Sequence, residues 1–157
     1  MQGAAAAKVS AFAIVRRPDG AVLCTVERKK HRIGVPGGKK SLSDAMEWES
    51  IVRREFQEEV GVEMQASASS CYLEWGSSAY QVRFKIIDVS SETAAAIPTG
   101  PSSDRGVVEI AWHHPARLNR RRVRPHVYAA LQIVKAHSLI SSQPTAKRRA
   151  RRIARPS

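Results

Sequence analysis

The chain has 157 residues, 43% of them hydrophobic, and a formal net charge of +12 at pH 7. This length suits one domain with a real core. No apolar run approaches the roughly 20 residues that a membrane helix needs, so a membrane protein is not expected. The first residues, MQGAAAAKVS, lack the pattern of a secretory signal.

The charge is unevenly distributed. Residues 1–116 contain 14 Lys and Arg and 14 Asp and Glu, whereas residues 117–157 contain the other 12 Lys and Arg and no acid, so the whole excess lies there (26 − 14 = 12). We therefore expect a domain over residues 1–140 and a basic, disordered tail over residues 141–157. The two cysteines, Cys24 and Cys71, are expected to be buried free thiols, which indicates a reducing compartment, cytoplasmic or alternatively nuclear.

Two β-branched, apolar runs open the chain, at residues 8–16 and 21–28. The sequence Arg17-Pro18-Asp19-Gly20 between them is a strong turn signal, so the pair predicts a β-hairpin. The basic run 29–32 then leads into the glycine pair Gly37-Gly38. This basic run is either a solvated connection or a means of attracting a polyphosphate.

A helix is predicted over residues 44–60, with Ser43 or Asp44 as its N-cap and Gly61 as its stop signal. The expected inward positions of this helix are Met46, Ser50, Ile51 and Phe56. Strands are predicted over residues 71–75, 80–89 and 107–112, and a mobile loop over residues 90–104. A last helix over residues 125–140 would bury Val127, Leu131 and Val134. His113 and His114 are interpreted as surface or hydrogen-bonded histidines.

Three carboxylates are concentrated near the end of the first helix. Glu55, Glu58 and Glu59 stand at positions i, i+3 and i+4, so they project from one helix face. Like charges this close repel one another, and hard oxygen ligands suit Mg²⁺, Mn²⁺ or Ca²⁺ better than zinc. The alternative for an isolated pattern of this kind is a solvated acidic helix face.

The surrounding residues favour the metal site. The stretch resembles the signature of the Nudix hydrolase family, G-x5-E-x7-R-E-U-x-E-E-x-G-U with U an aliphatic residue. The positions that fit it in order are Gly38, Arg54, Glu55, Glu58, Glu59, Gly61 and Val62. The stretch is two residues longer than the signature, so the first signature glutamate falls on Asp44 or Met46, and Asp44 or Glu47 is left to replace it. Phe56 stands where the family has an aliphatic residue.

The resemblance covers roughly residues 9–140 and implies a Nudix-like α/β/α sandwich with a mixed β-sheet. It also implies an enzyme dependent on Mg²⁺ or Mn²⁺ that cleaves a nucleoside diphosphate linked to another group. Glu55, Glu58 and Glu59 would be metal ligands, with a backbone carbonyl near Gly37 as a further one. Arg54 would orient a glutamate. The general base stays open between Glu58 and Glu109.

The substrate is less defined by the sequence. Nucleoside triphosphates, including oxidised ones, and dinucleoside polyphosphates are the leading candidates that the resemblance implies. Lys30, Arg32 and Lys39 are candidate polyphosphate contacts, and Tyr80 stands at a spacing similar to that of a tyrosine in dinucleoside polyphosphate hydrolases. Tyr80 could equally be an ordinary strand aromatic.

Two arginine-rich clusters end the chain. The first comprises Arg117, Arg120, Arg121, Arg122 and Arg124, and the second includes the sequence KRRARR at residues 147–152. The second cluster resembles a nuclear-localisation signal and equally a nucleic-acid-binding arm; the alternative is a solubilising tail. Residues 120–124 could instead reach a polyphosphate. The basic tail keeps open the hypothesis of an RNA 5′-end, decapping-like hydrolase. The irregular loop at residues 44–47 keeps open that of a non-catalytic nucleotide-binding module.

Overall fold

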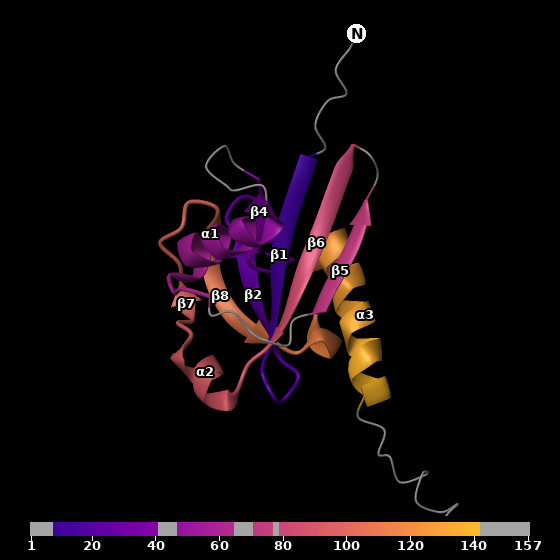
Figure 1. Ribbon diagram of the computed structural model, residues 1–157. Coiled ribbons are helices and arrows are strands. Elements are labelled where there is room, and N and C mark those ends of the chain that lie inside the picture. Colours follow the sequence, from indigo (N-terminus) through magenta and orange to yellow (C-terminus); the bar gives the residue numbers. More distant parts are fainter. Residues whose placement is uncertain (1–7, 41–46, 65–70, 77–78, 142–157) are drawn as a thin grey trace, which may run out of the picture.

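The computed structural model describes residues 8–40, 47–64, 71–76 and 79–141 (Figure 1). The predicted N-caps Ser43 and Asp44 and the proposed inward residue Met46 lie outside the described residues, as does the tail from residue 142 onward. None of the described helices is long and apolar enough to cross a membrane.

One mixed sheet forms the centre of the molecule. Its strands are β1 (Lys8–Arg16), β2 (Val22–Glu27), β3 (Ile33–Gly34), β4 (Gly37–Lys39), β5 (Cys71–Gly76), β6 (Tyr80–Asp88), β7 (Gly100–Pro101) and β8 (Val107–His113). The order across the sheet is β5-β6-β1-β2-β8-β7, with β3 on β2 and β4 on β1. Strands β1 and β6 run parallel, and the other pairs are antiparallel.

The helices are α1 (Trp48–Val60), α2 (Ser91–Ala96) and α3 (Pro125–Ser141), with short 3₁₀ turns η1 (Pro115–Arg117) and η2 (Arg120–Arg122) before α3. Helix α1 ends where Gly61 adopts a left-handed conformation with φ of 82°, as its stop signal predicts. Its N-cap position is occupied by Glu47, which makes no side-chain capping hydrogen bond. The predicted N-cap was therefore wrong, and the helix begins about one turn later than expected.

Helix α1 covers one face of the sheet. Its buried residues are Ile51, Val52, Phe56 and Val60. They join a core cluster with Ala13 and Leu23 from the sheet. The predicted stripe was right for Ile51 and Phe56, whereas Ser50 is only partly buried.

Helix α3 covers the opposite face, behind the sheet in Figure 1. Val127, Leu131 and Val134 are buried there, as their spacing predicts, against Phe12 and Phe84. Two apolar layers on opposite faces of one mixed sheet make an α/β/α sandwich, which confirms the fold predicted from the sequence.

The predicted hairpin and strands are present with small shifts at their ends. The segment 90–104 differs from its prediction as a mobile loop, because it contains α2 and β7. The Ser90 hydroxyl accepts a hydrogen bond from the Thr93 amide at 3.1 Å and so caps α2. This is a typical N-cap interaction followed by three helix-favouring alanines.

The sheet opens between β1 and β2 at the end that carries α1. These strands are registered at Arg16 and Val22, near their turn. Farther along, residues Ser10 to Phe12 of β1 pair with β4, and Thr25 and Val26 of β2 pair with β3. The β3–β4 segment therefore bridges the opening and carries the glycine pair to α1.

The two-layer packing gives a stability prediction. Leu131→Ala should lower the free energy of unfolding by about 2–5 kcal/mol, because it leaves a cavity in the α3 layer. Ile133→Ala on the same helix should cost less than about 1 kcal/mol, since Ile133 is 39% exposed. Urea denaturation measures both; equal losses would contradict the described orientation of α3.

Candidate active site

The two glycines of β4 allow α1 to lie directly against the sheet. A Cβ atom at Gly38 would stand 2.5 Å from Oε1 of Glu55, and one at Gly37, where φ is 151°, would collide with the backbone of Ala11 and Phe12. The Gly37 amide donates a hydrogen bond to Oε2 of Glu59 at 3.3 Å. A larger residue at Gly38 would therefore push Glu55 away from β4, and one at Gly37 would disturb the pairing of β4 with β1.

Arg54 joins two of the glutamates to β4. Its Nη1 lies 2.9 Å from Oε1 of Glu55 and 3.2 Å from Oε2 of Glu58, while its Nη2 donates to the Lys39 carbonyl at 3.0 Å. The orienting role that the resemblance implies for this arginine matches these contacts. The Glu58 side chain remains 51% exposed, whereas that of Glu55 is 16% exposed.

Ionisation of the buried carboxylates is unfavourable. Burial raises the pKa of Glu59 to about 9, and Glu55 adds to the shift; the Gly37 amide lowers it, and Asp104 and Glu58 raise it further. Burial also raises the pKa of Glu55 despite the neighbouring Arg54. A cation between Glu55 and Glu59 would reverse both penalties.

This carboxylate group fits Mg²⁺ or Mn²⁺ by its chemistry. All its donor atoms are hard carboxylate oxygens. Glu59, a buried member of the group, has no cationic partner among the described residues. Among the described residues, no three His, Cys, Asp or Glu side chains are already grouped to hold a metal ion. The reason is visible in the contacts: Glu58 pairs with Arg54, and Glu59 turns toward the Gly37 amide.

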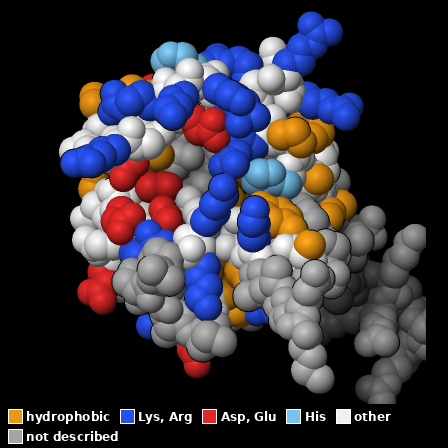
Figure 2. All heavy atoms as spheres, turned by 90° about the horizontal axis from the view of Figure 1, so that it is seen from above, with side chains coloured by type: hydrophobic (Ala, Val, Ile, Leu, Met, Phe, Trp, Pro, Cys, Tyr) orange, Lys and Arg blue, Asp and Glu red, His pale blue; other side chains and the backbone are white. Residues whose placement is uncertain are grey.

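A pocket of about 320 Å³ lies beside these carboxylates. Residues from five segments line it: Thr25, Glu27, Arg28, Lys29, Val35, Gly37, Glu59, Arg105, Gly106, Val107 and Arg124. Four of these residues are cationic, and one, Glu59, belongs to the signature. Figure 2, which looks down on this end of the sheet, shows acidic side chains grouped next to a band of Lys and Arg. Such a pocket suits a phosphate-rich ligand beside a cation.

The loop between β7 and β8 is fixed against this pocket. Arg28 donates from Nε to the Arg105 carbonyl at 3.1 Å and from Nη2 to the Asp104 carbonyl at 3.3 Å. The Asp104 carboxylate accepts the amides of Gly106 and Val107 at 2.8 and 3.0 Å. These bonds hold the loop so that Arg105 borders the pocket.

The four residues predicted to contact substrate do not line this pocket. Lys30 and Lys39 are exposed, and Arg32 pairs with Glu27. Tyr80 is 39% exposed, and its hydroxyl lies 3.4 Å from the Ser10 hydroxyl. The lining cations Arg28 and Arg105 were not singled out from the sequence, whereas Lys29 belongs to the basic run 29–32, for which attraction of a polyphosphate was one of two predictions. Arg124, which the sequence suggested could reach a polyphosphate, does border the pocket.

Glu109 and Asp104 occupy different surroundings. Glu109 is an exposed residue of β8, paired in register with Val26 and Pro101, and its role as a base stays a prediction. Asp104 is the downstream carboxylate that acts electrostatically on Glu55 and Glu59. Glu47 is exposed at the start of α1.

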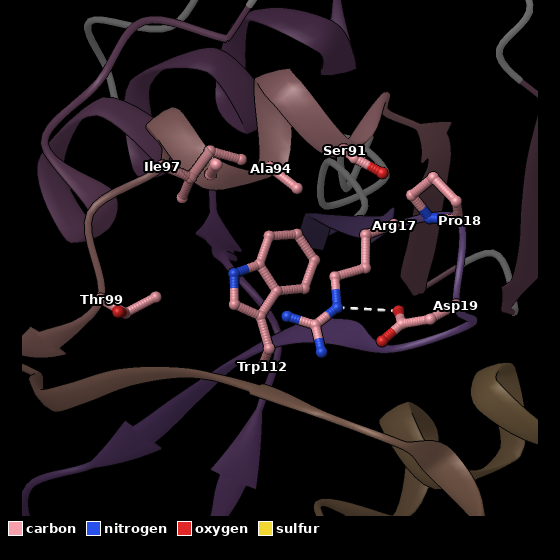
Figure 3. Close-up of a pocket in the computed structure, with 9 residues that line it drawn as sticks. Arg17, Pro18, Asp19, Ser91, Ala94, Ile97, Thr99 and Trp112 are labelled. Carbon is pink, nitrogen blue, oxygen red and sulfur yellow. Dashed lines mark hydrogen bonds and ion pairs between the residues drawn. The ribbon is translucent and has the colours of Figure 1, made fainter.

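A larger cavity, of about 440 Å³, lies at the opposite end of the sheet (Figure 3). Its one carboxylate, Asp19, is paired with Arg17 at 2.7 Å, and the Arg17 guanidinium lies 5.3 Å from the centre of the Trp112 ring. The cavity contains none of the signature residues. The smaller pocket is therefore the better candidate for an active site, because charge and signature meet there.

This architecture is similar to that of several solved structures. A NUDIX hydrolase from Nitrosomonas europaea is 18% identical, with a TM-score of 0.62, over 83% of this chain and 90% of that one. The NUDIX domain of Shewanella oneidensis NrtR, complexed with ADP ribose, is 13% identical with a TM-score of 0.63, over 87% and 90%. The chain has the Nudix fold. No protein-family model matches the sequence, and no curated protein is similar to it.

A third Nudix-fold relative is a bifunctional NMN adenylyltransferase/ADP ribose pyrophosphatase from Francisella tularensis, complexed with AMP and a Mn ion. It is 13% identical with a TM-score of 0.61, over 83% of this chain and 42% of that one. At these identities, the likeness shows the fold.

The buried carboxylate gives a testable pH dependence. The pKa of Glu59 rises from 4.5 in the unfolded chain to about 9, so between these values the folded state holds a proton that the unfolded state has lost. Stability without metal should therefore fall as the pH rises through this range. In a chelator at pH 8, Glu59→Gln should be more stable than wild type by about 1–2 kcal/mol, or roughly 2–8 °C in Tm.

Thermal unfolding between pH 5 and pH 8.5 measures this difference. Glu63→Gln, at an exposed position just beyond α1, is the matched control and should follow the wild type at every pH. A Glu59→Gln advantage that does not grow with pH would contradict the burial of this carboxylate.

Proposed function

We propose that this chain is a Nudix pyrophosphohydrolase dependent on Mg²⁺ or Mn²⁺. Its substrate would be a nucleoside diphosphate linked to another group: a nucleoside triphosphate, oxidised or not, or a dinucleoside polyphosphate. The observation that carries the proposal is that Glu59, a signature carboxylate in contact with the Gly37 amide, forms one wall of a pocket lined by four cationic side chains. The Francisella and Shewanella structures, with AMP and Mn and with ADP ribose, support a nucleotide ligand.

Glu55 and Glu59 would hold the metal, and Glu58 would complete the set by turning from Arg54. The carbonyl near Gly37 is a further candidate ligand. When bound, Mg²⁺ or Mn²⁺ neutralises charge on the phosphate oxygens and lowers the pKa of nearby water. Arg54 would keep Glu55 and Glu58 in place through its bonds to both and to β4.

The pocket cations would bind and orient the phosphates. Arg28, Lys29, Arg105 and Arg124 surround the space next to Glu59, so a phosphate chain lying there would present one phosphorus to water. The water oxygen bonds to phosphorus, the bridging P–O bond breaks, and the proton passes to a carboxylate. Glu58 suits this role because its side chain is half exposed; Glu109 remains the alternative base.

A nucleotide panel tests the proposal. Wild type should hydrolyse one class of nucleotide with Mg²⁺ or Mn²⁺, and Glu58→Gln should lower kcat/KM by about 10²–10⁴-fold because a proton acceptor is lost. Product release is followed by chromatography and phosphate detection on 8-oxo-dGTP, dinucleoside polyphosphates, ADP-ribose, nucleotide sugars and capped RNA.

Glu63→Gln should retain full activity in the same panel. The absence of turnover with every nucleotide and either metal would overturn the proposal. Nucleotide binding without turnover would instead favour the non-catalytic binding module, which the two extra residues in the signature stretch suggest.

The remaining partner hypotheses concern the tail, which lies outside the described residues. Binding of nucleic acid or an import receptor by residues 141–157, and a cytoplasmic or nuclear location, stay predictions from the sequence. Turnover of capped RNA that is lost when this tail is removed would favour the RNA 5′-end hydrolase.

A further inference from the structure

Two residues that line the pocket, Glu27 and Arg124, belong to a linked trio of charges with Arg32. Glu27 lies between two arginines: its Oε1 is 3.1 Å from Nε of Arg124, and its Oε2 is 3.3 Å from Nε of Arg32. The Glu27 side chain is 23% exposed, so this pairing is partly shielded from solvent. Both carboxylate oxygens are used for arginine contacts, and each arginine contributes its Nε.

Arg124 is fixed along its whole length. Its amide donates to the Ile33 carbonyl at 3.0 Å, and the adjacent Val123 forms a parallel bridge with Ile33. Its aliphatic stem packs over Gly34, where an added Cβ atom would stand 3.5 Å from the Arg124 Cδ. Its guanidinium lies 5.9 Å from the centre of the Phe12 ring. The backbone, the stem and the guanidinium therefore each have a partner.

This arrangement leaves the terminal Nη groups of Arg124 available to donate hydrogen bonds to a ligand. Nε of Arg124 pairs with Glu27, and its two terminal Nη groups make no hydrogen bond to any described residue. Arg124 also lines the same pocket as Glu59. Two parallel N–H groups at a fixed position match the oxygens of a phosphate. Arg32 shares Glu27 but does not line the pocket.

Resting on the proposed function, we propose that Arg124 is the specific phosphate-binding residue of this pocket and that Glu27 is its positioning residue. Arg124 would form a bidentate contact with a substrate phosphate in the pocket that Glu59 also lines. Glu27 would fix the rotation of the guanidinium so that this contact forms without further ordering.

The charge of Glu27 makes the proposal sharply testable. If the pocket attracted phosphate through its net charge alone, Glu27→Gln would remove a nearby negative charge and strengthen binding. If Glu27 positions Arg124, the same substitution weakens binding. The two accounts predict opposite signs for one substitution.

Binding of inorganic pyrophosphate, measured by isothermal titration calorimetry with and without saturating Mg²⁺, tests this without requiring turnover. We expect Arg124→Gln to weaken binding by about 10-fold or more, and Glu27→Gln to weaken it by about 3-fold or more. In an Arg124→Gln background, Glu27→Gln should have no further weakening effect, because its target is gone.

Arg121→Gln, which removes one charge from an exposed position outside the pocket lining, is the control and should change binding less than about twofold. Arg124→Lys keeps the charge but loses the paired N–H groups, so it should bind nearly as weakly as Arg124→Gln. Thermal unfolding of each variant confirms that the fold is retained.

Stronger binding by Glu27→Gln, or an undiminished effect of that substitution without Arg124, would overturn the positioning role. Wild-type binding by folded Arg124→Gln would overturn the phosphate contact itself. Both results are independent of hydrolysis. If the wild type hydrolyses a nucleotide of the panel but Arg124→Gln binds pyrophosphate as the wild type does, the proposed function stands and this inference is overturned.

Discussion

The close packing of α1 on the glycines of β4 is the constraint on which the rest of the site depends. Without side chains at Gly37 and Gly38, the helix approaches until Glu55 covers Gly38 and Glu59 accepts the Gly37 amide. This closeness buries carboxylates that would otherwise be solvated, and burial raises the pKa of both. The helix, the glycines and the buried carboxylates are therefore one physical arrangement.

The open sheet determines where the candidate pocket lies. Since β1 pairs with β4 and β2 pairs with β3 beyond the turn, the two strands diverge at the end that carries the signature. The end of β2, the β7–β8 loop and the residue before α3 then bring arginines to the same space. Glu59 borders this space together with four cationic side chains. These cations would attract a polyanion and orient it before any chemistry.

Local sequence features predicted the local parts of this structure well. The spacing of Glu55, Glu58 and Glu59 fixes their common helix face, and Gly61 ends the helix, because both effects act within one or two turns. The buried positions of α3 follow from their period for the same reason. The segment 90–104 was misread because its serine and proline content outweighed the capping serine before three alanines.

The pocket cations were harder to predict because their convergence is long-range. Arg28, Arg105 and Arg124 are far apart in the sequence, and strand pairing together with the Arg28 hydrogen bonds to the β7–β8 loop brings them together. Lys30 and Arg32 are neighbours of lining residues, yet the turn after β2 directs Lys30 to solvent, and Arg32 pairs with Glu27. A basic run indicates that cations surround the entrance, but the register of the strands decides which of them enter it.

Divalent-cation binding tests the central claim most directly. Mn²⁺ binding, followed by electron paramagnetic resonance at neutral pH, should be saturable in the wild type and displaced by Mg²⁺. It should weaken at least about tenfold in Glu55→Gln and in Glu59→Gln, since each loses a charged ligand, and remain unchanged in Glu63→Gln. Equal Mn²⁺ affinity in all four proteins would mean that the buried carboxylates of α1 are not a metal site, and the account of the pocket as an active site would fail with them.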